Sequence, residues 1–182
     1  RLNIEKCYFF KSKINFLGYI ISDKGLEADP KKVEKIRNFP IPKTPKQVKS
    51  FIGLASYYRR FIQNFAAIAR PLHNLTKTKN PGVWDEKTQK SFDLLKLALT
   101  NTPVLVRPDF DKEFILVTDA SGKGLGAICT QLDENGHEHP IQYVSRGLKS
   151  SEVNYGVSKL ECLAVIWAIT LFRPYLLGRK FT

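Results

Sequence analysis

The chain has 182 residues and a formal net charge of +12, with 43% hydrophobic and 25% charged residues, a balance typical of a folded chain rather than a disordered one. Its three cysteines include no C-x-x-C pair, which argues against a disulfide framework or a structural zinc site and favours a reducing compartment. The longest apolar run, 162–172, is too short to cross a bilayer, so we expect no membrane partner.

The first predicted elements are two short strands and a helix. Aromatic and isoleucine side chains dominate residues 7–22 around a polar KSKIN centre, which predicts two strands joined by a turn. After a turn at 23–25, Asp29-Pro30 pairs a helix N-cap with a proline at the first helical position. We expect this helix to stop before Pro40, where a run of prolines keeps the chain extended.

A second helix begins at Thr44-Pro45, where Gln47 completes a capping box. At about 100° per residue, it has a core side with Val48, Phe51, Ala55, Tyr58 and Ile62, and a basic side with Lys46, Lys49, Ser50, Gly53, Tyr57 and Arg60. Glycine inside a helix costs about 1 kcal/mol relative to alanine, so Gly53 needs a compensating reason. Close approach to a sugar-phosphate backbone and close packing against another helix are the two candidates, and the surrounding cations favour the first.

A third helix follows a polar linker at 77–82. It starts at Trp84-Asp85 and ends near Thr102-Pro103, and its apolar side consists of Phe92, Leu95 and Leu99.

From Phe114 onward the pattern changes to strands. They are predicted at 114–119, 125–132 and 141–145, with a glycine turn at 121–126 and a loop at 133–139. A long helix over about 158–177 follows. Three successive antiparallel strands and a helix, after a helical first part, predict an α+β fold.

Positive charge is concentrated in the first part of the chain. Residues 1–108 hold 21 Lys and Arg against 8 Asp and Glu, whereas residues 109–182 hold 8 against 9. An excess spread over so long a segment predicts contact with a polyanion, nucleic acid first and an acidic membrane surface second. A solvated lysine-rich surface without a ligand is the alternative.

Two acidic residues stand in apolar surroundings. Asp119 ends an apolar strand, where a buried carboxylate is costly unless a cation or a donor meets it, and Glu161 lies in the first turn of the long apolar helix. Each has an ordinary alternative: Asp119 as a turn residue, and Glu161 as part of a capping box with Ser158. A two-metal site needs three or four converging carboxylates, so these two alone are too few.

Two further motifs are weaker. Glycines at 122, 124 and 126 precede a strand rather than a helix, which argues against a dinucleotide-binding turn and favours a flexible β-turn. His137 and His139 flank Glu138 and are candidate metal ligands, but we expect an exposed turn without a further ligand nearby.

Many spaced motifs follow one another along essentially the whole chain. They include SFIGLASYYRRFI at 50–62, FIL-x-TDAS at 114–121, HPI-x-Y-x-SR at 139–146 and FRPYLLGRKFT at 172–182. In this order the sequence resembles the pol polyprotein of gypsy-type LTR retrotransposons, from the end of the reverse transcriptase into its ribonuclease H. The resemblance implies a palm end with the primer-grip hairpin at 1–28, a helical thumb at 29–80, a linking helix and connector at 81–112, and a truncated, partial ribonuclease H-like fold at 113–182.

The resemblance implies nucleic-acid binding by the first part. Phe16, Leu17, Gly18 and Tyr19 resemble the primer grip, which holds the 3′ end of the primer, and the second thumb helix would lie against the minor groove of the template–primer. Hybrid duplexes expose a wide, shallow minor groove, so the basic side of that helix, with Lys46, Lys49, Gly53, Tyr57 and Arg60, agrees with this placement. We expect binding that tolerates any sequence and weakens with salt.

The resemblance also implies chemistry at Asp119 and Glu161. They match two of four metal-binding carboxylates of the family's ribonuclease H, in which two Mg²⁺ ions activate a water and stabilise the leaving oxygen to cut the RNA strand of a hybrid. The third carboxylate would follow Thr182, and the polymerase aspartates would precede Arg1. We therefore expect an RNA-directed DNA polymerase and ribonuclease H as the parent enzyme, and a chain that binds hybrid weakly and catalyses nothing.

The implied partners are RNA–DNA hybrid, template–primer duplex and the remainder of the pol polyprotein. The implied location is a cytoplasmic virus-like particle, with the nucleus as the alternative. The sequence contains no methionine, even at position 1, and its start is not typical of a signal peptide, so we expect a piece of a longer protein.

Two other interpretations stay open. A host-adopted or decayed element would yield only a nucleic-acid-binding module, although the presence of both Asp119 and Glu161 argues against decay. A nucleic-acid-binding protein unrelated to polymerases would have the same charge pattern, but the order of three strands and a helix with these two acids would be coincidence.

Overall fold

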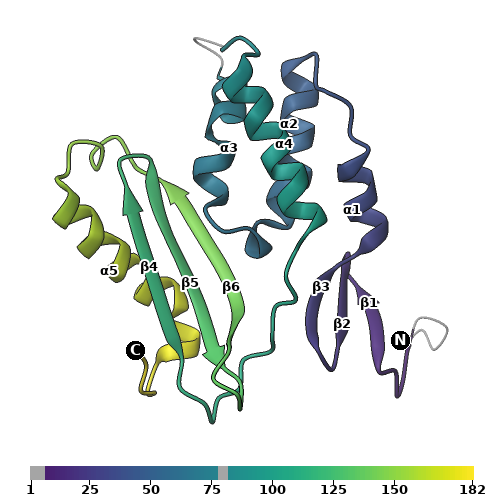
Figure 1. Ribbon diagram of the computed structural model, residues 1–182, viewed down its shortest axis with the longest axis vertical. Coiled ribbons are helices and arrows are strands. Elements are labelled where there is room, and N and C mark those ends of the chain that lie inside the picture. Colours follow the sequence, from purple (N-terminus) through teal and green to yellow (C-terminus); the bar gives the residue numbers. More distant parts are fainter. Residues whose placement is uncertain (1–6, 78–81) are drawn as a thin grey trace.

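A computed structural model describes residues 7–77 and 82–182. Figure 1 shows two parts side by side: a first part with a small sheet and four helices, and a second with a longer sheet and one helix. We call them the helical part (7–105) and the sheet part (114–182). The α+β fold with antiparallel strands is confirmed, while residues 78–81 of the predicted linker lie outside the described residues.

The chain begins with a three-stranded antiparallel sheet. Its strands are β1 (Lys13–Phe16), β2 (Tyr19–Ser22) and β3 (Gly25–Ala28), paired in that order. The prediction of a turn around KSKIN is wrong, because the turn is at Leu17-Gly18, where φ is 49° and 76°. A two-residue hairpin of this kind needs positive φ at both central residues, and Leu17 carries no sequence signal for it. The strand β3 was not predicted.

Local capping chemistry sets the starts of the first two helices. In α1 (Pro30–Arg37) the Asp29 side chain accepts a hydrogen bond from the Lys31 amide, and α2 (Pro45–Tyr57) begins with the predicted capping box of Thr44 and Gln47. The α-helical periodicity, however, does not extend to Ile62. It ends at Tyr57, and a 3₁₀ turn, η2 (Arg59–Phe61), follows with tighter backbone hydrogen bonds.

Two more helices complete the helical part. The sequence did not predict α3 (Phe65–Asn74), whereas α4 (Glu86–Thr100) starts as predicted behind the Asp85 cap. All five core residues predicted for the second helix are buried, although Tyr58 and Ile62 lie beyond the end of α2, and so are the three of α4. They form one core, in which the rings of Phe51 and Phe92 meet with their centroids 4.5 Å apart.

The sheet part consists of one sheet and one helix, which share a separate hydrophobic core. Its strands β4 (Ile115–Ser121), β5 (Gly124–Leu132) and β6 (Glu138–Gly147) pair in order as an antiparallel sheet. The helix α5 (Val157–Leu176) packs against β4 and β5. Of the helices within 7–77 and 82–182, none is long and apolar enough to span a membrane.

Candidate nucleic-acid interface

Three tyrosines join the Leu17-Gly18 turn to the C-terminal end of α2. Tyr57 donates its hydroxyl to the carbonyl of Leu17, and Tyr58 donates to the carbonyl of Gly18 at 2.8 Å. Tyr19 donates to the Tyr57 carbonyl at 2.9 Å and stacks on the Tyr57 ring, with centroids 5.1 Å apart. The structure thus brings the predicted primer-grip residues together with the end of the predicted thumb helix.

The tyrosine contacts depend on neutral hydroxyls and on a glycine. Burial raises the pKa of Tyr58 to about 12 and also raises the pKa of Tyr19, so both side chains remain hydrogen-bond donors at neutral pH. Gly18 has a φ of +76°, and a Cβ there would lie 3.3 Å from the Tyr58 hydroxyl. Both its conformation and its crowded position therefore favour glycine.

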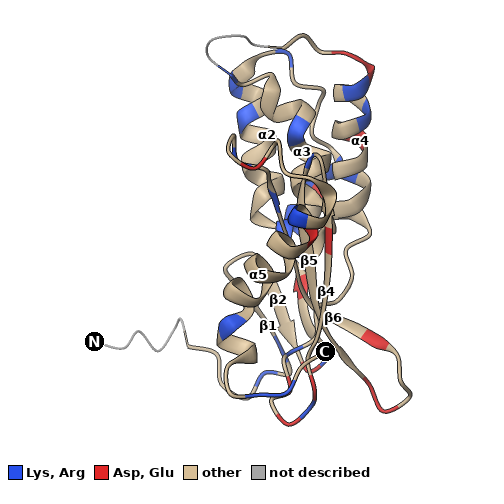
Figure 2. Ribbon diagram, turned by 90° about the vertical axis from the view of Figure 1, so that its left-hand side faces the viewer, with Lys and Arg blue, Asp and Glu red and all other residues tan. Residues whose placement is uncertain are grey.

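The outer side of α2 is exposed and basic. Lys46, Lys49, Ser50 and Gly53 all face solvent, and Figure 2 shows Lys and Arg distributed over the helices of this part. A Cβ on Gly53 would meet no atom within 4 Å. Among the described residues nothing packs on this glycine, so no helix in the described part of the chain accounts for it.

Arg60 does not lie on the predicted basic side of α2, because α2 ends before it. It lies in η2, it is only partly exposed, and its Nε has no hydrogen-bond partner in the described part of the chain. Its charge is close enough to Tyr19 to oppose, as a smaller effect, the rise in the pKa of that tyrosine caused by burial. The exposed arginine of η2 is its neighbour Arg59, which a continuous α-helical periodicity could not identify.

Asp119 projects from the sheet face opposite α5. The strand register places it in one row with Gly126 and Ser145. That row faces the junction of η2 and α3, since the Ala66 amide donates to Ser145 Oγ at 2.9 Å, and a Cβ on Gly126 would lie 2.7 Å from Asn64 Oδ1. The adjacent row, which includes Ala127 and Val144, packs instead with the core residues of α5.

Glu161 lies on α5, the helix that packs on the other face of the sheet. The N-cap of α5 is Gly156, without a side-chain cap, so the predicted capping box at Ser158 is not formed and Glu161 lies in the second turn. The end of β4 and the start of α5 lie at the same end of the sheet (Figure 1). Even so, no three His, Cys, Asp or Glu side chains of the described residues form a group that could hold a metal ion.

The described residues therefore do not form a complete two-magnesium centre. Such a centre needs three or four carboxylates that converge on both ions, and no three metal-ligating side chains of the described residues form such a group.

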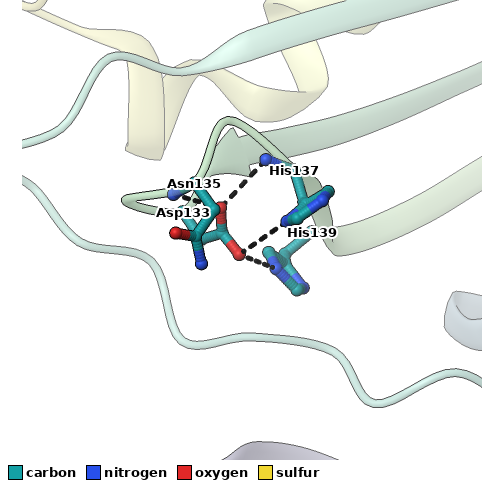
Figure 3. Close-up of polar contacts among 4 residues, drawn as sticks. All are labelled: Asp133, Asn135, His137 and His139. Atoms are coloured by element: carbon teal, nitrogen blue, oxygen red, sulfur yellow. Dashed lines mark hydrogen bonds and ion pairs between the residues drawn. The ribbon is translucent and has the colours of Figure 1, made fainter.

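The loop between β5 and β6 holds the two histidines around one carboxylate. His137 Nδ1 lies 3.4 Å and His139 Nε2 lies 3.0 Å from the same oxygen of Asp133 (Figure 3). Backbone amides of Asn135 and His137 donate to its other oxygen. The amide of His137, followed by the ring of His139, holds the pKa of Asp133 well below its usual range. Asp133 is thus the partner of both histidines, which the sequence did not identify. Its hydrogen bonds to backbone amides form the turn.

Comparisons with known proteins agree with this architecture. The model of the RNase H-like domain found in reverse transcriptase matches residues 84–182. The chain is 43% identical over its whole length to the Retrovirus-related Pol polyprotein from transposon 297 of Drosophila melanogaster, of which it covers 17%. It is 39% identical, over 99% of its length, to the corresponding polyprotein from transposon gypsy of the same organism, of which it covers 18%.

A solved structure has the same fold. A foamy viral protease-reverse transcriptase in complex with RNA/DNA hybrid superposes with a TM-score of 0.79 at 23% identity, over 98% of this chain and 24% of that one. The chain spans less than a fifth of the length of the two curated relatives. It belongs to the family of RNase H-like domains found in reverse transcriptase, and its sequence is that of a segment of a retrotransposon Pol polyprotein.

Proposed function

We propose that this chain binds the RNA–DNA template–primer duplex of a retrotransposon reverse transcriptase, with the outer side of α2 in the minor groove and the Leu17-Gly18 hairpin beside the primer strand. The observation that carries the proposal is the tyrosine-bonded junction of this hairpin with the end of α2. Two surfaces that act on one duplex need a fixed relative position, and this junction supplies it.

The exposed surface of the junction supports the same function. Phe16 and Leu17 are 55% and 70% exposed, so their side chains are free to contact sugars or bases rather than a protein core. On α2, an exposed glycine one turn beyond Lys49 lets a flat helix surface approach a wide minor groove. Lysine contacts to phosphates release counterions and make binding depend on salt.

The parent polyprotein is proposed to carry out RNA-directed DNA synthesis and Mg²⁺-dependent cleavage of the RNA strand of hybrids. Asp119 and Glu161 would be two of its metal-binding carboxylates. The 182-residue chain is proposed to bind without cleaving, because no three metal-ligating side chains of its described residues form a group that could hold a metal ion.

The binding proposal is tested by Gly53→Ala, compared with the wild-type chain. Alanine removes the glycine penalty of about 1 kcal/mol and meets no atom within 4 Å, so the variant is expected to unfold at higher urea concentration. If the helix approaches a duplex at this point, the same variant binds a labelled RNA–DNA hybrid more weakly. Higher stability with unchanged affinity would contradict the placement of α2 in the groove.

Lys49→Ala provides the charge test, with Lys112→Ala as a matched control on an exposed lysine that precedes β4. The salt slope of hybrid binding is expected to fall by about one counterion for Lys49 and to stay unchanged for Lys112. If the salt dependence of hybrid binding were equal for Lys49→Ala and the wild type, α2 would not contact the duplex through Lys49.

Catalysis is tested by adding Mg²⁺ and labelled hybrid to the chain. We expect no cleavage. Cleavage that disappears in Asp119→Asn would show that the chain contains a complete site.

A further inference from the structure

Residues 106–113 join the helical part to the sheet part, and we call them the bridging segment. They form no helix or strand, and most of them are exposed. The chain reaches this segment after α4 by running between β3 and β6 (Figure 1). An exposed irregular segment usually leaves the parts on either side free to move, but here its backbone is hydrogen-bonded to both sheets.

The beginning of the bridging segment is fixed to the small sheet. Directly before it, Leu105 exchanges two backbone hydrogen bonds with Leu26 of β3, at 2.7 and 2.9 Å. Arg107 then donates from Nη2 to the carbonyl of Ser22 at 2.7 Å. A Cβ on Gly25, the register partner of Ser22, would collide with the carbonyl oxygen of Leu105. The chain therefore lies so close to the β2–β3 turn that only glycine fits there.

The rest of the bridging segment is fixed to the larger sheet by Gln131 of β5. This glutamine is only 4% exposed. Its Oε1 accepts a hydrogen bond from the Asp109 amide at 2.9 Å, and its Nε2 donates to the carbonyls of Asp109 and Lys112 at 2.6 and 3.2 Å. Burying an amide is costly unless hydrogen bonds replace its water, so these bonds stabilise the position of the segment on the strand.

Both anchor points are connected through paired strands to the two proposed contact sites. Ser22 ends β2, the strand that begins directly after the Leu17-Gly18 turn. Gln131 lies on the same strand as Gly126, the register partner of Asp119. The bridging segment therefore links the turn to Asp119 through hydrogen-bonded elements.

A second contact opposes rotation of the two parts about the bridging segment. The Val106 amide donates to the carbonyl of Pro140 at 2.9 Å, near the beginning of β6. The Ala66 amide of the helical part bonds to Ser145, near the end of the same strand. Two bonded points that are separated along one strand leave the parts less freedom than a single hinge.

We propose that Arg107 and Gln131 are positioning residues, which hold the bridging segment against both sheets and thereby fix the distance between the Leu17-Gly18 turn and Asp119. This inference rests on the proposed function, in which the turn lies beside the primer strand and Asp119 is a metal-binding carboxylate. The separation of these two sites is then set by the protein before any nucleic acid binds. The alternative is a local role, in which Gln131 only shapes the turn at 109–112.

The experiment measures the distance between the two parts by pulsed electron–electron double resonance. Nitroxide labels are attached at Leu97→Cys on α4 and Ile166→Cys on α5, which are 58% and 63% exposed and lie outside the proposed duplex contacts. Cys7→Ser and Cys162→Ser remove the two cysteines that are not buried. Burial raises the pKa of Cys129 to about 11, so this thiol stays protonated and unreactive and is left in place.

The variants separate the hydrogen bonds from the packing of the same side chains. Gln131→Met removes the three bonds but keeps a side chain of similar length, and Arg107→Ala removes the bond to Ser22. Arg107→Lys keeps a donor. The controls are Lys112→Ala, which leaves the carbonyl bond of that residue to Gln131 in place, and Gln142→Ala on β6, which takes no part in the bonds of the bridging segment.

The labelled wild-type background is expected to give one narrow distance distribution, which saturating RNA–DNA hybrid does not change. Gln131→Met and Arg107→Ala are each expected to broaden this distribution, because the segment is then fixed to only one sheet. Arg107→Lys is expected to restore it, since the ammonium group can donate to the same carbonyl. Lys112→Ala and Gln142→Ala are expected to leave it unchanged.

Near-ultraviolet circular dichroism verifies the fold of each variant, since Trp84 packs against the core of the helical part and Trp167 against that of the sheet part. A wild-type distance distribution in folded Gln131→Met would assign these bonds a local role and overturn the proposal. A wild-type distance that shifts or narrows when hybrid is added would also overturn it, because the nucleic acid would then set the separation. If the labelled chain retains no hybrid at low ionic strength, the proposed function is overturned, and the distances in the free chain alone decide whether the bonds hold the two parts together.

Discussion

The helical part and the sheet part bury their apolar side chains in different ways. In the helical part, side chains from four helices and the small sheet share one core. In the sheet part, α5 covers one face, and the other face meets the helical part through Asn64 and Ala66. The more basic part is therefore the more self-contained one. Its charges lie outside a complete core, whereas Asp119 is exposed on the row of the sheet that meets the helical part.

The largest effect is expected from breaking the core of the helical part. Phe92 is 1% exposed and packs against the rings of Phe51 and Trp84. Phe92→Ala is therefore expected to lower the free energy of unfolding by about 3–5 kcal/mol. Leu97→Ala, on the exposed side of the same helix with 58% exposure, is the control and is expected to change it by less than about 0.5 kcal/mol. Urea denaturation measures both. A similar loss for the two variants would contradict a single core in this part.

A smaller effect is expected from separating the two parts. In Gly126→Ala the new Cβ would lie 2.7 Å from Asn64 Oδ1, so the Asn64 side chain must shift and the contact between this row and the η2–α3 junction is disturbed. We expect a loss of about 1–3 kcal/mol and faster hydrogen exchange of the Ala66 amide, which bonds to Ser145.

Gly122→Ala is the control for this contact, because a Cβ at Gly122 meets no atom within 4 Å. If hydrogen exchange of the Ala66 amide were unchanged in Gly126→Ala, the contact of Gly126 with Asn64 would not stabilise the packing of the two parts.

The smallest effect concerns an ion pair inside the sheet part. The hydrogen bond from Arg146 holds the pKa of Glu152 at about 2. Because the pKa is lower in the folded state, the pair stabilises the fold above the unfolded pKa of about 4.3, and this contribution is lost as the pH falls from there towards 2.

Glu152→Gln removes that part of the pH dependence, while a control change at exposed Glu134 does not. Thermal unfolding between pH 5 and pH 2 measures it. If Glu152→Gln lost stability between pH 5 and pH 2 as steeply as the wild type, the Arg146–Glu152 pair would not be the cause of that loss.

Features set by neighbouring residues were predictable from the sequence. The Asp29, Thr44 and Asp85 caps begin helices because side chain and amide lie within three residues of each other. The apolar periodicity of α2 and α4 identified buried positions, since a helix repeats its buried side regularly.

Features set by distant residues were not predictable. The tyrosine hydrogen bonds join positions about 40 apart in the chain, and no local pattern encodes them. The same holds for the face of the sheet from which Asp119 projects, which depends on strand register. The helix α3 does have a sequence signal, the helical spacing of Phe65, Ala69 and Leu72 on its buried side, but the prolines and polar residues around it hide this pattern.

The tyrosine junction has a mechanical consequence. Because Tyr19, Tyr57 and Tyr58 tie the hairpin turn to the end of α2 through three separate hydrogen bonds, a tilt of the helix would carry the turn with it as one lever. Removing one of these hydroxyls would therefore loosen the coupling between the turn and the helix before it unfolds either of them.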